Sequence, residues 1–150
     1  MSIFNAFNIN ASGMTAERYR MDIISENVAN QNTTRTKDGT PYRRKVVTFE
    51  ERGERVGNFS SFLGSASRAY KGKGVRVGKV MEDEWTQMNM VYDPSHPDAD
   101  ENGYVLYPNV NIVTEMTNLI DASRSYEANA TAFNASKGIA MKGLEMGNQA

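Results

Sequence analysis

Residues 112–144 read IVTEMTNLIDASRSYEANATAFNASKGIAMKGL, and their apolar side chains recur at alternating steps of four and three residues. The positions are Ile112, Met116, Leu119, Ser123, Tyr126, Ala130, Phe133, Lys137, Ala140 and Leu144, of which only Ser123 and Lys137 depart from the pattern. A narrow stripe of this period is typical of a coiled-coil seam, whereas an ordinary globular helix has a wider apolar face. We therefore predict a long C-terminal helix, roughly 50 Å at a rise of ~1.5 Å per residue.

The start of this helix carries several local signals. Pro108 precedes it, Asn109 or Asn111 can cap it, and Glu115 lies in the first turn, where the helix dipole favours a carboxylate. Alanine, serine and asparagine are frequent over residues 122–136. Such small side chains indicate that a neighbouring backbone approaches closely.

A second stripe with the same spacing lies at the N-terminal end. Its positions are Ile3, Phe7, Asn10, Met14, Glu17, Met21, Ile24 and Val28. The helix is expected to end near residues 30–32, because Asn-Gln-Asn-Thr-Thr favours hydrogen bonds from side chains to the backbone over helix.

The polar middle of the chain is rich in glycine and β-branched residues. We predict strands at residues 46–49 and 74–80, with a possible bulge at Gly78, and a turn at Asn102-Gly103 that leads into a possible strand. Residues 52–73 are expected to form a mobile loop.

These patterns predict an α+β fold. Long N- and C-terminal helices pair as a coiled-coil-like bundle, and a small β-rich section lies between them. The expected division is an N-terminal helical segment over residues 1–32, a β-rich middle over 33–108 and a C-terminal helical segment over 109–150.

Composition excludes several function classes. Seventeen lysines and arginines against eighteen acidic residues leave a net charge of −1, so the chain has no overall basic field for binding nucleic acid. The absence of cysteine excludes disulfides, thiolate metal sites and cysteine nucleophiles. The first residues show no signal-peptide pattern, so we expect no cleaved leader.

Acidic residues concentrate in the loop from Asp93 to Asn102, which is the basis of an alternative function. Asp98, Asp100 and Asn102 match the first positions of a calcium-binding EF-hand loop, but the twelfth position falls on Asn109 where a glutamate is required. Prolines also prevent a helix from entering the loop. A calcium- or metal-binding module remains the alternative, and a proline-fixed surface turn is the favoured interpretation.

Enzyme chemistry has little support. His96 is the only histidine, and neither a Gly-x-Ser-x-Gly elbow nor a phosphate-binding glycine loop is present. We expect no catalytic residues, no cofactor, no metal and no small-molecule substrate.

Several motifs, taken in order, resemble the axial proteins of the bacterial flagellum, and among them the rod proteins. The motifs are Asn27-Val28-Ala29-Asn30, then Val91-Tyr92-Asp93-Pro94 with His96-Pro97-Asp98-Ala99-Asp100, then Gly103-Tyr104-Val105, Pro108-Asn109-Val110-Asn111, Glu115-Met116 and the run from Ala122 to Asn129. The resemblance spans nearly the whole chain.

This resemblance implies a structural subunit of the proximal rod of the basal body. Such a subunit assembles with copies of itself and other rod subunits around a hollow axis, transmits torque, and is exported to the periplasmic rod by the flagellar type III apparatus. The expected assembly interface consists of Phe7, Met14, Met21, Ile24, Asn27, Val28, Ala29, Asn30, Met116, Leu119, Ser123, Tyr126, Ala130 and Phe133.

Overall fold

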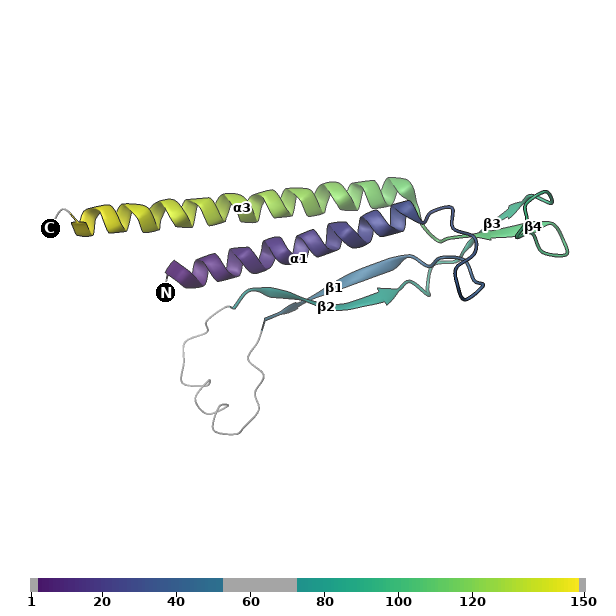
Figure 1. Cartoon of the computed structure of the whole chain (residues 1–150), viewed down its shortest axis with the longest axis horizontal. Helices are drawn as coiled ribbons and strands as arrows, with labels where there is room; N and C mark the ends of the chain where they lie inside the picture. The colour runs from purple at the N-terminus through teal and green to yellow at the C-terminus, as the bar shows by residue number, and fades with distance from the viewer. Residues whose placement is uncertain (1–2, 53–72, 149–150) are drawn as a thin grey trace, which may run out of the picture.

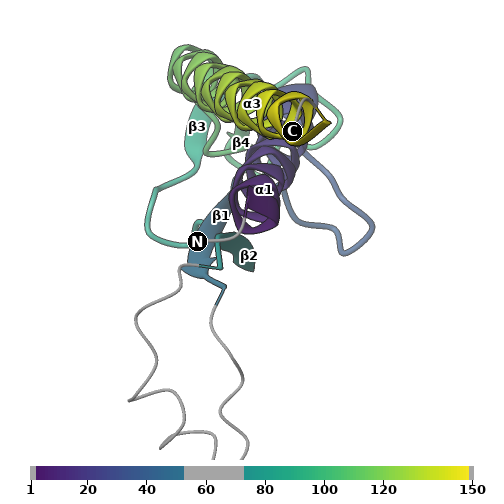
Figure 2. The same ribbon diagram turned by 90° about the vertical axis from the view of Figure 1, so that its left-hand side faces the viewer.

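The computed structural model describes residues 3–52 and 73–148, and it has the expected α+β architecture. Helix α1 (Ile3–Ala29) and helix α3 (Ile112–Asn148) run antiparallel as a long hairpin (Figure 1). Strands β1 (Lys45–Glu51) and β2 (Val75–Glu82) form a hairpin that packs on α1. Strands β3 (Asn89–Tyr92) and β4 (Tyr104–Tyr107) form a second hairpin beyond the end of the helices. Figure 2 shows α1 between α3 and the β1–β2 hairpin.

The end of α1 follows the asparagine-rich signal in the sequence. Asn30 donates from Nδ2 to the Glu26 carbonyl over 2.9 Å, and its Oδ1 accepts a hydrogen bond from the Thr33 hydroxyl at 3.1 Å. The Glu26 carbonyl also accepts from the Asn30 backbone amide at 3.1 Å, so the Asn30 side chain reinforces the last backbone hydrogen bond of the turn. Helix α1 ends at Ala29, one residue before the predicted range of 30–32.

Helix α3 begins where its cap predicts. Of the two candidate caps, Asn111 is the one used, because its Oδ1 accepts the Thr114 amide proton at 3.2 Å. Asn109 is instead buried and bonds to backbone groups of Arg44, Asp83 and Thr86. Pro108, just before the cap, is also buried.

The β1–β2 hairpin contains the predicted bulge. Val47 pairs with Val80, yet Phe49 pairs with Val77, so Gly78 and Lys79 together face Thr48. The Thr48 hydroxyl closes the gap by accepting from the Lys79 amide at 3.0 Å and donating to the Lys79 carbonyl at 3.2 Å. The predicted loop over residues 52–73 lies, apart from its two end residues, outside the described part of the chain.

Strand β3 is not predicted from the sequence. Its four residues, Asn-Met-Val-Tyr, are exposed and include only one β-branched residue, so they carry a weak strand signal. Pairing with the predicted strand β4 creates it, with Val91 opposite Val105. Gly103, with φ of +82°, occupies the turn position that a residue with a Cβ rarely adopts.

The buried core is small and unusually polar. Its apolar members are Ala16, Ile24, Tyr42, Val105, Val110 and Ala122, and its polar members are Ser12, Asn27, Asn109 and Glu115. The two helices approach closely at Gly13, where a Cβ would lie 2.6 Å from Oδ1 of Asn129. This approach agrees with the small residues of the α3 sequence.

Candidate assembly surfaces and the junction that positions them

Asn27, on the last turn of α1, is 1% exposed and uses its whole amide group. Its Oδ1 accepts from the Lys45 amide at 2.8 Å and from the Tyr42 hydroxyl at 2.9 Å. Its Nδ2 donates to the Lys45 carbonyl at 2.9 Å and to Oε2 of Glu115 at 3.0 Å. One side chain therefore joins α1, the start of β1 and α3, with two donors and two acceptor sites satisfied.

Glu115 is the charged centre of this junction and is 0% exposed. Oε1 accepts from Nε of Arg44 at 2.8 Å, and a second guanidinium nitrogen of Arg44 lies 2.7 Å away. A buried carboxylate is costly without such a partner, so removing either group leaves the other desolvated and uncompensated. Sequence reasoning assigned Glu115 only to the helix dipole and missed this ion pair, whose sole sequence signal is the Glu115-Met116 motif.

Arg44 extends the junction to the turn between β2 and β3. Its guanidinium lies 3.6 Å from Asp83, and its backbone amide donates to Oδ1 of Asn109 at 2.9 Å. Asn109 Nδ2 donates to the carbonyls of Asp83 at 2.8 Å and Thr86 at 3.2 Å. Hydrogen bonds from Thr86, chiefly from its side chain, hold the pKa of Asp83 below its usual range. The junction thus connects both helices to the β-rich section.

Burial raises the pKa of Tyr42, with nearby Glu26 adding to the effect, so its phenol remains a neutral donor to Asn27.

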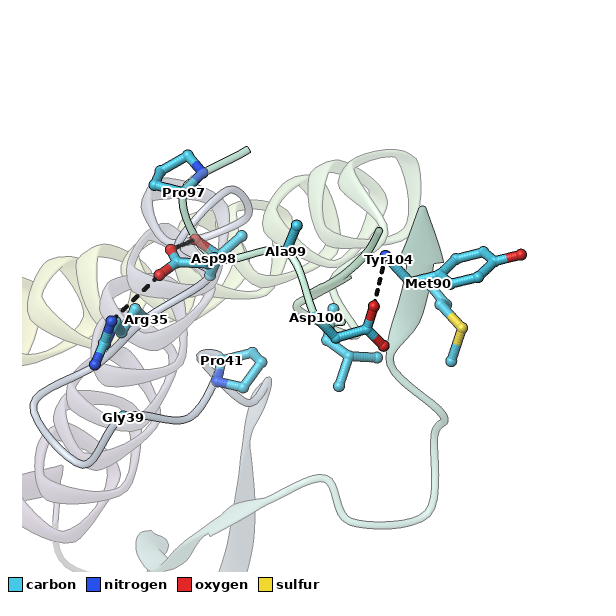
Figure 3. Close-up of a pocket in the computed structure, with 11 residues that line it drawn as sticks. Arg35, Gly39, Pro41, Met90, Pro97, Asp98, Ala99, Asp100 and Tyr104 are labelled. Atoms are coloured by element: carbon cyan, nitrogen blue, oxygen red, sulfur yellow. Dashed lines mark hydrogen bonds and ion pairs between the residues drawn. The ribbon is translucent and has the colours of Figure 1, made fainter. Parts of the chain in front are cut away.

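The acidic loop performs a structural task in this chain. Asp98 accepts from the Thr34 hydroxyl at 2.8 Å and lies 3.6 Å from the Arg35 guanidinium. Oδ1 of Asp100 accepts from the amides of Asn102 at 2.9 Å and Tyr104 at 2.8 Å. Figure 3 shows the Asp98 carboxylate directed at Arg35 and that of Asp100 turned back to Tyr104, beside a cavity of about 400 Å³.

This geometry lends no support to the metal-binding alternative. Nδ1 of His96 accepts from the Asp98 amide at 3.1 Å, so that nitrogen is engaged in the turn. The hydroxyl and amide of Ser95 hold the pKa of Asp93 below its usual range. Over residues 3–52 and 73–148, no three histidine or acidic side chains come together as a metal ion would need.

The expected seam of α1 is half-buried within the subunit. The Phe7 ring lies 5.0 Å from the Phe133 ring, centroid to centroid, and Ile24 is buried. Met14, Met21 and Val28 are half-buried. Of the signature that follows, Ala29 is exposed, Asn30 closes the helix and Asn27 belongs to the junction.

On α3 the seam lies partly out of phase with the face that contacts α1. Glu115 and Ala122 are fully buried, whereas the neighbouring seam position Met116 is 56% exposed and Tyr126 is also exposed. Leu119, Ser123, Ala130 and Phe133 are half-buried. The fully buried positions on α3 therefore carry a small side chain, Ala122, and a carboxylate, Glu115, while Met116 of the seam remains exposed.

Two groups of apolar side chains on α3 are left exposed. The first comprises Val113, Met116 and Ile120, on the side of the helix turned away from α1. The second comprises Ile139, Met141, Leu144 and Met146 in the last turns. Neither described helix contains a stretch apolar enough to cross a lipid bilayer. Exposed apolar groups of this kind mark protein contacts.

An α-helical hairpin with exposed apolar side chains and a small β-rich end is typical of a structural subunit of a larger assembly. Comparison with known protein families agrees with this class of protein. Residues 7–37 match the family described as "Flagella basal body rod protein", and residues 101–146 match "Flagellar basal body rod FlgEFG protein C-terminal". These two matches include the whole Asn27 signature and the start of α3.

Curated relatives define the family more narrowly. The chain is 48% identical to the flagellar basal-body rod protein FlgC of Bacillus subtilis, over 98% of this chain and 99% of the relative. It is 43% identical to FlgC of Borreliella burgdorferi over 93% of each chain, and 36% identical to FlgC of Salmonella typhimurium over 98% and 99%. The chain belongs to the FlgC family of flagellar basal-body rod proteins. It is therefore a structural subunit of the basal-body rod.

Proposed function

We propose that this subunit assembles through its terminal helices, with copies of itself and other subunits of the proximal rod, into a hollow helical structure that transmits torque. The observation that carries the proposal is the exposure of apolar side chains along α3, exemplified by Met116, despite its pairing with α1. Assembly offsets the cost of that exposure by burying these side chains against neighbouring helices.

The proposed interface is the expected set of seam residues. Within it, Met116 and Tyr126 are free to meet a neighbour, whereas Phe7 and Phe133 contact each other inside the subunit. We assign the first pair to contacts between subunits and the second to the stability of the hairpin. The divisions at residues 32/33 and 108/109 then separate the axial helices from the outer β-rich section.

The junction around Glu115 suits the transmission of torque. Its buried ion pair and hydrogen bonds connect α1, α3 and the β-rich section at one point. Fully satisfied polar networks rigidify the place where they lie, so this junction is suited to hold the three elements in fixed relative positions. In this proposal the subunit performs no chemistry.

Export by the flagellar type III apparatus, without a cleaved leader, completes the proposal and places the subunit in the periplasmic rod. The resemblance to axial proteins supports this route. A strain with an inactive export apparatus should retain the protein in the cytoplasm, and the mass of the protein in isolated basal bodies should equal that of the intact chain. A shortened N-terminus would contradict this route.

Electron microscopy of the concentrated full-length protein tests the assembly itself. Rods or tubes are expected, and a strain that lacks the gene should regain basal bodies and motility when the chain is supplied. A chain that stays monomeric at high concentration and does not restore rods would contradict the proposal.

A further inference from the structure

The end of α3 projects past the first described residues of α1. Phe133 lies opposite Phe7, so in an antiparallel hairpin the last α3 position with a partner on α1 lies about four residues further on. Figure 1 shows α3 continuing beyond that point. A Cβ added at Gly138 or Gly143 would meet nothing within 4 Å, as expected for an uncovered helix end.

The projecting end is apolar on more than one side. At 100° per residue, Leu144 lies on the same side of α3 as Phe133 and half-buried Ala140, so it continues the stripe that contacts α1. Leu144 is 72% exposed. Ile139 and Met146 are exposed on the other side. A helix end with apolar side chains on opposite sides requires a concave partner.

A concave, uncharged surface with apolar and polar side chains lies at the other end of the same helix. A groove of about 680 Å³, within the size range of binding clefts, lies between β3 and the first turn of α3. Its apolar lining includes Met90, Val91, Ile112 and Val113. The rest includes asparagine and glutamine side chains, and none of the lining residues carries a charge. The projecting helix end is nearly neutral too, because Lys142 pairs with Glu145 at 3.0 Å.

We propose that the projecting end of α3, residues 139–147, docks in the groove between β3 and α3 of a second copy of this chain. The proposal rests on the assembly proposed above and specifies the surfaces that meet. The two surfaces lie at opposite ends of the molecule, so one copy cannot satisfy both. A contact between different surfaces at opposite ends is heterologous. It repeats as an open helix when its rotation does not close into a ring, and an open helix is the symmetry that a rod requires.

Cross-linking between two single-cysteine variants tests this contact, and the cysteine-free chain makes every product assignable. Val113→Cys and Leu144→Cys place thiols in the groove and on the projecting end, both at exposed positions where the fold is preserved. The two full-length variants, with tags of different size, are mixed under assembly conditions and treated with a short bis-maleimide. Within one chain the two sites are about 45 Å apart along α3, so no product forms internally.

We expect a strong heterodimer band from the mixture and little product from either variant alone. Thr131→Cys mixed with Leu144→Cys is the matched control, because Thr131 is exposed on the same helix but outside the groove. Equal cross-linking in this control, or strong homodimers of either single variant, would overturn the proposal.

Electron microscopy of the same mixtures separates the two levels of the hypothesis. Assemblies that form without the Val113–Leu144 product would refute the proposed docking but would still support rod assembly. Loss of both the cross-linked product and the assemblies would refute the proposed docking together with self-assembly.

As a second measurement, Val113→Lys and Leu144→Glu should each raise the concentration needed for assembly about tenfold or more, because each places an unpaired charge in the proposed contact. An equimolar mixture of the two should recover part of that loss, and no recovery would count against direct contact.

Discussion

Glu115 accepts a hydrogen bond over 3.0 Å from Asn27, a residue 88 positions earlier in the chain, and both side chains are almost completely buried. This bond joins the end of one axial helix to the start of the other. Together with Arg44 it places an ion pair where the two helices meet the β-rich section.

The junction should dominate the stability of the subunit. We expect Glu115→Ala to lower the free energy of unfolding by about 3 to 5 kcal/mol, because it leaves the Arg44 guanidinium without its buried partner. Asn27→Ala should cost about 1 to 3 kcal/mol through unpaired polar groups. Urea unfolding followed by circular dichroism measures both. Glu127→Ala, exposed on α3, is the control and should stay within about 0.5 kcal/mol of the parent. Equal effects at Glu115 and Glu127 would contradict this role.

Two glycines on the axial helices should respond in opposite directions. Gly13→Val is expected to destabilise the hairpin, because the new side chain meets Asn129 where even a Cβ lies 2.6 Å from Oδ1. Gly138→Ala faces open space and should stabilise the helix by up to about 1 kcal/mol through propensity alone. Thermal unfolding of both variants checks the contrast. A harmless Gly13→Val would mean that the helices do not approach closely there.

Exposed and half-buried seam positions should separate assembly from folding. Met116→Asp is expected to leave the unfolding midpoint almost unchanged while motility and rod formation fall sharply, since Met116 is exposed in the subunit. Phe133→Asp should lower the unfolding midpoint as well as rod formation, because Phe133 also contacts Phe7 within the subunit. Thr131→Asp, exposed on the same helix, controls for added charge. Normal rods with Met116→Asp would remove this residue from the interface.

Hydrogen exchange on the dilute monomer should follow a gradient along the hairpin. We expect the slowest amides near the junction, around residues 115–122, and the fastest at residues 139–147, which have no partner on the described part of α1. Incorporation into a rod should protect the fast end. Slow exchange at residues 139–147 in a verified monomer would show that this end is already covered.

The acidic loop should tolerate the loss of its carboxylates with a modest effect. Asp98→Ala with Asp100→Ala removes hydrogen bonds to Thr34 and to two backbone amides, for an expected loss of about 1 to 3 kcal/mol in stability, with rod formation largely intact. Calorimetry with calcium and with zinc should show no specific binding to the parent. Micromolar affinity that this double variant abolishes would revive the metal-binding alternative.

Much of the fold could be predicted because its signals are local. Both helices follow from a 3.5-residue apolar period and from caps such as Asn30 and Asn111. The bulge at Gly78 and strand β4 follow from residue preferences over a few positions. Strand β3 could not be predicted, because its pairing partner and not its own composition makes it a strand.

The sequence by itself determined the helices, most of the strands and the family, because these depend on periodicity, capping and ordered motifs along the chain. Only the tertiary structure decided which face of α3 is buried. Ala122 and Glu115 are fully buried while Met116 is exposed, because Glu115 meets Arg44 and Asn27, which come from distant segments of the chain. The pairing of Asn27 with Glu115 also depends on the antiparallel register of two distant helices. No local pattern encodes that register, because it results from packing two surfaces that are separated by most of the chain.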